Sequence, residues 1–167
     1  MYIRKANMED RGNILAIYAY ARKFMKEHGN AEQWGDVYPP AEKVEADIRQ
    51  EKLYVCIHEE TIAAVFYYAQ EDDEDYRVIE GAWLDDRPYG VVHRIASAGV
   101  VKGAASFCLE WAYRQAGNLR IDTHVDNKPM QSLLHKLGFT YCGRICPRDA
   151  PSWMAYQKNC ISVSHVL

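Results

Sequence analysis

Residues 91–106 decide the fold; they read Val91-Val92-His93-Arg94-Ile95-Ala96-Ser97-Ala98-Gly99-Val100-Val101-Lys102-Gly103-Ala104-Ala105-Ser106. The stretch predicts a buried strand, then a loop of small residues, then a helix that begins directly after the loop. The first turn of a helix has unpaired N–H groups and the positive end of the helix dipole, so such a loop can bind an anion. Gly103 and the alanines after it leave room for a phosphate to approach the main chain. The stretch therefore predicts a phosphorylated ligand.

Apolar residues recur with the period of a strand or a helix along most of the remaining chain. Strands are predicted at 2–6, 53–58, 61–69, 91–97, 119–125, 139–145 and 153–157, and helices at 8–28, 102–116, 130–137 and from the residue after Pro40 to about Gln50. Residues 76–84 are also expected to be extended. The order βααβββαβαββ indicates an α/β protein with a mixed sheet and helices on both faces. No linker or repeat divides the chain, so we expect one domain at 1–158 and a C-terminal tail at 159–167.

Composition and charge narrow the class of protein. The chain has 167 residues, of which 49% are hydrophobic and 26% charged, and its formal net charge is -3. This is the composition of a globular domain. No basic stripe is present to bind nucleic acid, no apolar run is long enough to span a membrane, and the first residues do not form a signal peptide. We therefore expect a cytoplasmic protein without nucleic-acid or membrane partners.

Two local patterns have plain structural interpretations. The five cysteines are scattered and odd in number, which favours reduced thiols. Cys142 and Cys146 lie four residues apart, but no second close pair completes a tetrahedral zinc site, so we expect no metal there. The acidic run Glu71-Asp72-Asp73-Glu74-Asp75 is typical of a solvated loop.

The predicted strand at 119–125 is chemically the most unusual element. Alternation places Leu119, Ile121, Thr123 and Val125 on one face and Arg120, Asp122, His124 and Asp126 on the other. Buried strands of parallel sheets are normally apolar on both faces. The ionisable face therefore indicates a network of ion pairs or a functional site, to which His93 on the neighbouring strand could contribute. A metal site formed by Asp122, His124 and His93 is a third interpretation.

With these elements in this order, the chain resembles the GNAT superfamily of N-acetyltransferases over residues 2 to about 158. Proteins of that family carry an R/Q-x-x-G-x-G/A loop that holds the pyrophosphate of acetyl-CoA. The matching window is Val100-Val101-Lys102-Gly103-Ala104-Ala105, in which Val100 replaces the usual Arg or Gln. The family also has an Asn about eleven residues before a Gly-Phe pair, a spacing shared by Asn127 and Gly138-Phe139. Leu134 stands where the family commonly has a Tyr that protonates the departing sulfur.

The resemblance implies that acetyl-CoA is the co-substrate and indicates which residues bind it. It places the backbone of Ile95, Ala96 and Ser97 beside the pantetheine arm, where a strand amide near Ile95 could also stabilise an oxyanion. The expected cofactor contacts are completed by Lys102, Gly103, Ala104, Ala105, Ser106 and Asn127. Asn127 also precedes a predicted helix and is a candidate N-cap ahead of Pro129.

Acetyl transfer to an amine requires a group that takes a proton from it, because an ammonium has no lone pair. The candidates are His124, Asp122 and His93, together with Glu80, since family members often have an acidic residue on the strand before the cofactor strand. The aromatic residues Trp34, Tyr38 and Trp83 are candidates for the acceptor pocket, with simple packing as the alternative.

The resemblance thus implies an enzyme that moves an acetyl group from acetyl-CoA to a primary amine by direct attack, without a covalent enzyme intermediate. The acceptor is expected to be a small-molecule or peptide amine, and family members are often homodimers. Two other functions stay open. One is a non-catalytic acyl-CoA-binding or sensing domain, suggested by Val100 and Leu134; the other is a metal-dependent oxygenase or hydrolase.

Overall fold

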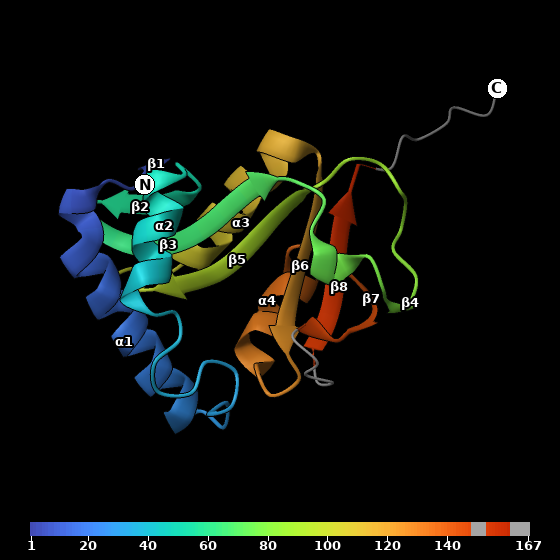
Figure 1. Ribbon diagram of the computed structural model, residues 1–167, viewed down its shortest axis with the longest axis horizontal. Helices are drawn as coiled ribbons and strands as arrows, with labels where there is room; N and C mark the ends of the chain where they lie inside the picture. Colours follow the sequence, from blue (N-terminus) through green and yellow to red (C-terminus); the bar gives the residue numbers. More distant parts are fainter. Residues whose placement is uncertain (148–152, 161–167) are drawn as a thin grey trace.

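The computed structural model describes residues 1–147 and 153–160. The strands among them are β1 (Tyr2–Lys5), β2 (Leu53–His58), β3 (Thr61–Gln70), β4 (Glu80–Gly81), β5 (Gly90–Ser97), β6 (Asn118–His124), β7 (Thr140–Ile145) and β8 (Trp153–Asn159). The helices are α1 (Arg11–Glu27), α2 (Ala41–Arg49), α3 (Ala104–Ala116) and α4 (Lys128–Lys136), with short 3₁₀ turns η1 (Met8–Asp10) and η2 (Glu74–Tyr76) (Figure 1). No helix in the described part is long and apolar enough to cross a membrane.

The predicted helices and strands are present with shifts only at their ends, but the extended segment predicted at 76–84 is wrong. It is a loop in which only β4 pairs, with β7. Its apolar residues do not alternate between buried and exposed as in a strand: the buried Tyr76 packs against Trp83, with ring centres 5.2 Å apart, whereas Val78 and Leu84 are exposed. At the other end of the chain, β8 runs one residue past the predicted domain boundary, and residues 161–167 lie outside the described part.

One sheet joins the described strands in the order β1-β2-β3-β5-β6-β8-β7-β4. Every neighbouring pair is antiparallel except β5 and β6, which are parallel. Their pairing is confined to Gly90 with Leu119 and Val91 with Arg120, and the two strands then diverge (Figure 1). Beyond Val91, β5 therefore has no partner strand on the β6 side, and its backbone groups there are open to a ligand.

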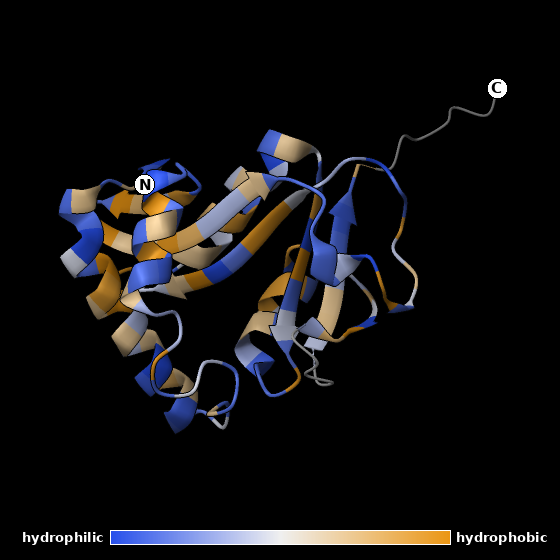
Figure 2. Cartoon of the chain, in the orientation of Figure 1, coloured by the Kyte–Doolittle hydropathy of each residue, from blue (hydrophilic) through white to orange (hydrophobic). Residues whose placement is uncertain are grey.

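Helices cover both faces of the sheet, as predicted. On one face, α1 and α2 contribute Ile14, Tyr18 and Val44 to a core that includes strand residues of β2 and β3. On the other, α3 and α4 contribute Leu109 and Leu134 to a second core. Figure 2 shows hydrophobic and hydrophilic segments alternating along α1, as expected of a helix with one buried face. Leu134 is fully buried, so the position where the family has its tyrosine serves packing here.

A β-bulge interrupts the pairing of β5 with β3. Val65 pairs with Ala96 and Tyr67 with His93, so two residues of β5 oppose a single residue of β3. Arg94, inside the bulge, has a φ of 50°, a left-handed conformation that is costly for a residue with a side chain. The hydroxyl of Tyr18 donates a 2.9 Å hydrogen bond to the Arg94 carbonyl and helps to hold this geometry. The bulge breaks the alternation of the strand, so His93 and Arg94 both line the same cavity.

Candidate active site

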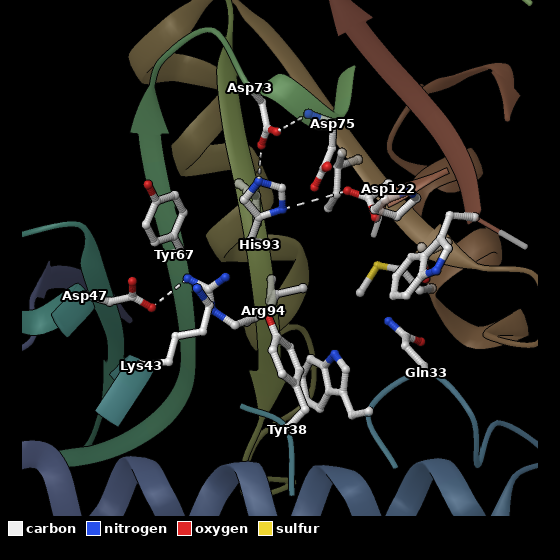
Figure 3. Close-up of a pocket in the computed structure, with 18 of the residues that line it drawn as sticks. Gln33, Tyr38, Lys43, Asp47, Tyr67, Asp73, Asp75, His93, Arg94 and Asp122 are labelled. Atoms are coloured by element: carbon white, nitrogen blue, oxygen red, sulfur yellow. Dashed lines mark hydrogen bonds and ion pairs between the residues drawn. The ribbon is translucent and has the colours of Figure 1, made fainter. Parts of the chain in front are cut away.

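A cavity of about 470 Å³ lies where β5 and β6 separate (Figure 3). Its walls come from α2 and the loop before it, the end of β3, the η2 segment, β5, β6 and the beginning of α4. The acidic and basic side chains that line it are Lys43, Asp47, Glu71, Asp73, Asp75, His93, Arg94 and Asp122. Because ionisable groups are normally kept out of protein interiors, a cavity with this many of them is a candidate for chemistry.

His93 lines the cavity between two carboxylates, Asp73 and Asp122 (Figure 3). Its Nε2 is 2.6 Å from Oδ2 of Asp73, and its Nδ1 is 3.7 Å from Oδ1 of Asp122. The Tyr76 hydroxyl donates a 2.5 Å hydrogen bond to the same Asp122 oxygen. The acceptor at Asp73 fixes the proton of a neutral imidazole on Nε2, which leaves the lone pair of Nδ1 directed toward the Asp122 side.

The two carboxylates respond to this environment in opposite ways. Burial alone would raise the pKa of Asp73, but the hydrogen bond and charge of His93 hold it below the usual value. Burial raises the pKa of Asp122, and His93 and Tyr76 offset this only in part. Burial and the adjacent Asp122 carboxylate raise the pKa of Tyr76 well above its usual value, so its phenol stays protonated and acts as a donor.

The other side of the cavity contains Arg94 and Lys43. The Arg94 guanidinium donates from Nη2 to Oδ2 of Asp47 at 2.6 Å and lies 4.9 Å from the ring centre of Tyr67. Its side chain is only 9% exposed, and its Nε is buried without a partner among the described residues. Lys43, on α2, faces the cavity from the same side (Figure 3).

The structure brings together some of the catalytic candidates and separates others. His93 and Asp122 line the cavity together, whereas His124 and Glu80 are not among its lining residues. Nδ1 of His124 accepts a hydrogen bond from the Asp126 N–H, and its ring packs edge-on against Trp153. Glu80 is exposed on β4, at the sheet edge farthest from β1, so the strand before β5 in sequence is not its neighbour in space.

The aromatic candidates divide in the same way. Trp34 and Tyr38 line the cavity. Trp83 does not line it; its ring packs 4.3 Å from the Arg120 guanidinium, and its Nε1 donates to the Tyr76 carbonyl at 2.9 Å. Trp83 therefore supports the loop that presents Tyr76 to Asp122.

The predicted anion-binding loop has the expected local geometry. Gly103 is the N-cap of α3 with a φ of 84°, and no side chain caps the helix. A Cβ built on Gly103 meets no atom within 4 Å, so the space in front of the first turn is open. Of the other cofactor candidates, Ile95 lines the cavity, and Ala96, Ser97, Lys102, Ala104, Ala105 and Ser106 continue from it through the loop into α3.

Asn127 has the N-cap role that the sequence predicted. Its side chain accepts a hydrogen bond from the Met130 N–H at 3.2 Å and donates to Oε1 of Gln33 at 2.8 Å. Nearby on β6, Oγ1 of Thr123 is buried without a hydrogen-bond partner among the described residues, although Thr123 lines the cavity. An orphaned hydroxyl of this kind is typical of a place where a ligand completes the hydrogen bonding.

Sequence reasoning missed several residues of the site. The interpretation of 71–75 as a solvated loop is wrong for Glu71 and Asp73, which are partly buried in the wall of the cavity. The signal was present, since five acidic residues follow a buried strand, but only the fold turns Glu71 and Asp73 partly inward, while Asp75 lines the cavity and stays exposed. No sequence signal marks the bulge at Arg94 or the pairing of Arg94 with Asp47 on α2.

The sequence matches no family model and no curated protein, but solved structures resemble the chain closely. An acetyltransferase of the GNAT family from Streptococcus agalactiae is 30% identical, with 95% of each chain covered and a TM-score of 0.87. A putative acetyltransferase from Staphylococcus aureus is 29% identical, with 95% of this chain and 99% of that chain covered and a TM-score of 0.69. A putative acetyltransferase from Salmonella typhimurium, solved with acetyl-CoA, is 18% identical over 95% and 92% of the chains, with a TM-score of 0.59.

Three features together define an α/β acetyltransferase domain. Two parallel strands diverge, the helix that follows has an uncapped N-terminus, and a polar cavity lies between them. The similarity to the streptococcal protein shows which family of acetyltransferases this is. The chain belongs to the GNAT family of acetyltransferases. Acetyl-CoA is the co-substrate of this family.

Proposed function

We propose that the protein transfers the acetyl group of acetyl-CoA to the nitrogen of a primary amine. The observation that carries the proposal is His93, whose imidazole lies in the cavity between the carboxylates of Asp73 and Asp122. Carboxylates attract an ammonium, and an imidazole is suited to accept its proton near neutral pH. His93 is thus the general base of the proposal, Asp73 orients it, and Asp122 helps to hold the amine.

The residues present fit acetyl-CoA at the divergence of β5 and β6. The open space at Gly103 and the uncapped first turn of α3 suit its pyrophosphate. The unpaired edge of β5 from Ile95 to Ser97 suits the pantetheine amides, and the orphaned hydroxyl of Thr123 lies in the wall of the same gap. Lys102 is exposed beside the loop and adds positive charge.

The proposed reaction is a direct attack of nitrogen on the thioester carbon. His93 Nδ1 takes one proton from the ammonium, the N–C bond forms, and the C–S bond breaks as the sulfur leaves with the electron pair. The nitrogen loses a second proton, and the sulfur gains one. Leu134 is buried and has no proton to give, so the sulfur receives its proton from the reacting nitrogen or from water.

The proposal is tested by thiol release from acetyl-CoA across a panel of amines, with mass spectrometry of the products. We expect release that depends on the amine and a product heavier by one acetyl group. Acetyl-CoA alone should raise the melting temperature, because a ligand that binds only the folded state stabilises it. No shift at millimolar acetyl-CoA would overturn the assignment of the co-substrate.

A second candidate function is a non-catalytic acyl-CoA-binding domain. It is favoured by Leu134, which is packed in the core where the family has a proton donor, and by Val100, which is 56% exposed where the family has Arg or Gln. A melting-temperature shift with acetyl-CoA, combined with no thiol release for any amine, would select this function. Amine-dependent release selects the transferase.

A further inference from the structure

The charges of the cavity are separated into two ends. Around His93 lie three carboxylates, Asp73, Asp75 and Asp122, and the imidazole is the one basic side chain among them in the described part (Figure 3). Asp75 is tied to this end because its backbone N–H donates to Asp73 at 2.9 Å. This end has an excess of negative charge and suits an ammonium.

The opposite end has an excess of positive charge. Arg94 and Lys43 face it, and Asp47 is the acidic side chain that pairs with Arg94. Glu71, also on this side, is already engaged, because it accepts from Lys52 at 2.8 Å and from Tyr67 at 2.7 Å. Lys43 makes no ion pair with a described residue, and the buried Nε of Arg94 has no hydrogen-bond partner there. The positive charges of Arg94 and Lys43 are balanced only in part by the one carboxylate of Asp47, so this end can bind one more anionic group.

The bulge places the two ends within the reach of a small molecule. His93 and Arg94 are consecutive residues, so their Cα atoms are about 3.8 Å apart, and the bulge lets both side chains enter one cavity. The surface between them and α4 is mixed: the apolar side chains of Trp34 and Met130 line it together with the polar side chains of Gln33, Thr123 and Asn127. The cavity is therefore complementary to a small molecule with an ammonium and an anionic group a short distance apart, and Trp34 and Met130 give an apolar part of that molecule a surface to pack against.

We infer that the acceptor is a small amino acid, with its ammonium at the His93 end and its carboxylate bound by Arg94 and Lys43. The inference rests on the proposed function and specifies its substrate class. A carboxylate fits better than a phosphate monoester, because a second negative charge would face Asp47 without a further cation. A diamine fits poorly, since its second ammonium would lie beside Arg94 and Lys43.

The first experiment compares leucine with two amines that lack only its carboxylate and with a diamine that carries a second ammonium. Thiol release is measured with acetyl-CoA and, in turn, leucine, leucinamide, 3-methylbutylamine and 1,4-diaminobutane. We expect kcat/KM for leucine to exceed the values for the other three by at least about tenfold, which is the scale of one charge-assisted hydrogen bond. Leucinamide and 3-methylbutylamine keep the primary amine and the side chain of leucine, so they test the carboxylate. The diamine tests whether a second positive charge is rejected.

The second experiment changes the residue that would bind the carboxylate. Lys43→Gln should raise KM for leucine about tenfold with little change in kcat, because the carboxylate does not react and its binding is uniform along the reaction. The same variant should raise KM for 3-methylbutylamine much less than KM for leucine, because that amine has no carboxylate. Lys23→Gln, at a side chain that is 77% exposed on α1, is the matched control and should behave as wild type with both acceptors. The double variant Arg94→Gln with Asp47→Asn removes the buried ion pair without leaving an unpaired charge and should abolish the preference for leucine.

The outcomes separate the two levels of the proposal. Equal or faster turnover of leucinamide or 1,4-diaminobutane, or a Lys43→Gln effect that is the same for leucine and 3-methylbutylamine, overturns the amino-acid acceptor and leaves amine acetylation standing. Thiol release with none of the four acceptors, in protein that acetyl-CoA stabilises, overturns both.

Discussion

Asp85 and Asp122 are carboxylates beside the two ends of β6, and they have opposite surroundings. Asp85 lies at the end where β5 and β6 pair, and accepts hydrogen bonds from Asn118 at 3.0 Å, Asn159 at 2.6 Å and Arg87 at 2.8 Å. Asp122 lies where the strands diverge, with the Tyr76 hydroxyl at 2.5 Å and the His93 ring at 3.7 Å.

The pKa values of the two groups follow the number of donors. Burial alone would raise the pKa of Asp85, but hydrogen bonds from Arg87 and Asn159 lower it to about 2. Burial raises the pKa of Asp122, because its few donors do not replace the lost water. The comparison shows two uses of a carboxylate. One whose oxygens all accept hydrogen bonds from the protein stabilises the fold, whereas one with few donors, beside a histidine and a cavity, is available for a substrate.

Replacement of His93 should produce the largest effect. His93→Gln removes the proposed base, and we expect kcat to fall about 100- to 10,000-fold, the range for a positioned general base. The melting-temperature shift with acetyl-CoA should persist, because His93 is not part of the cofactor loop. His58→Gln, on β2 and outside the lining of the cavity, is the control and should keep wild-type kcat. Unchanged kcat in His93→Gln, or the loss appearing in His124→Gln instead, would move the base elsewhere.

The glycines at the two ends of α3 give the next test, since both have positive φ and open space around a built Cβ. Gly103→Val should lower the affinity for acetyl-CoA by roughly 30-fold or more, equivalent to about 2 kcal/mol, because the side chain enters the phosphate space. Gly117→Val, at the end of α3 near the paired strands, has similar backbone strain but should leave the affinity unchanged. Isothermal titration with acetyl-CoA measures both. Equal losses in the two variants would mean that strain, and not the phosphate site, is responsible.

Replacing Asp85 and Asp122 one at a time should have opposite effects on stability and on kcat. Asp85→Ala leaves the side-chain donor of Asn159 and the backbone N–H of Arg87 without their acceptor. We expect a loss of about 2 kcal/mol in the free energy of unfolding, with kcat within a few-fold of wild type. Asp122→Asn keeps an acceptor for Tyr76 and removes a charge that burial disfavours, so stability should change by less than about 1 kcal/mol while kcat falls about tenfold. Urea unfolding and thiol release measure the two quantities; the same ranking in both assays would contradict the comparison.

The smallest expected effect is the pH dependence of stability contributed by Asp85. Its pKa in the folded protein, about 2, lies below the ordinary value of 3.8, so the stabilisation is fully present above 3.8 and is lost as the pH falls toward 2. The side chain is 20% exposed, and after solvent screening we expect a contribution of about 1 kcal/mol. Urea unfolding between pH 5 and pH 2 should therefore show a shallower loss of stability in Asp85→Asn than in wild type. Identical slopes would mean that other carboxylates cause the acid sensitivity.

Much of the fold could be predicted because it depends on local patterns. The period-2 and period-3.6 spacing of apolar residues predicts the strands and helices, and Gly103 between a strand and a helix predicts the open N-terminus of α3. The residues of the candidate site were predicted only in part. His93 and Asp122 could be named as candidates. Alternation along 119–125, however, places Asp122 and His124 on the same face of the strand, so both were equally good candidates for the base. The structure separates them, since His124 ends β6 and turns its ring nitrogen to the Asp126 N–H.

The sequence by itself determined the element order, the anion-binding loop and the resemblance to the GNAT family, because each depends on residues close together in the chain. Only the tertiary structure decided which charges meet. Asp73 reaches His93 across 20 positions, Tyr76 reaches Asp122 across 46, and Asp47 reaches Arg94 across 47. These contacts depend on strand register and on one bulge at Arg94, and a single step of register would turn the side chains to the other face of the sheet.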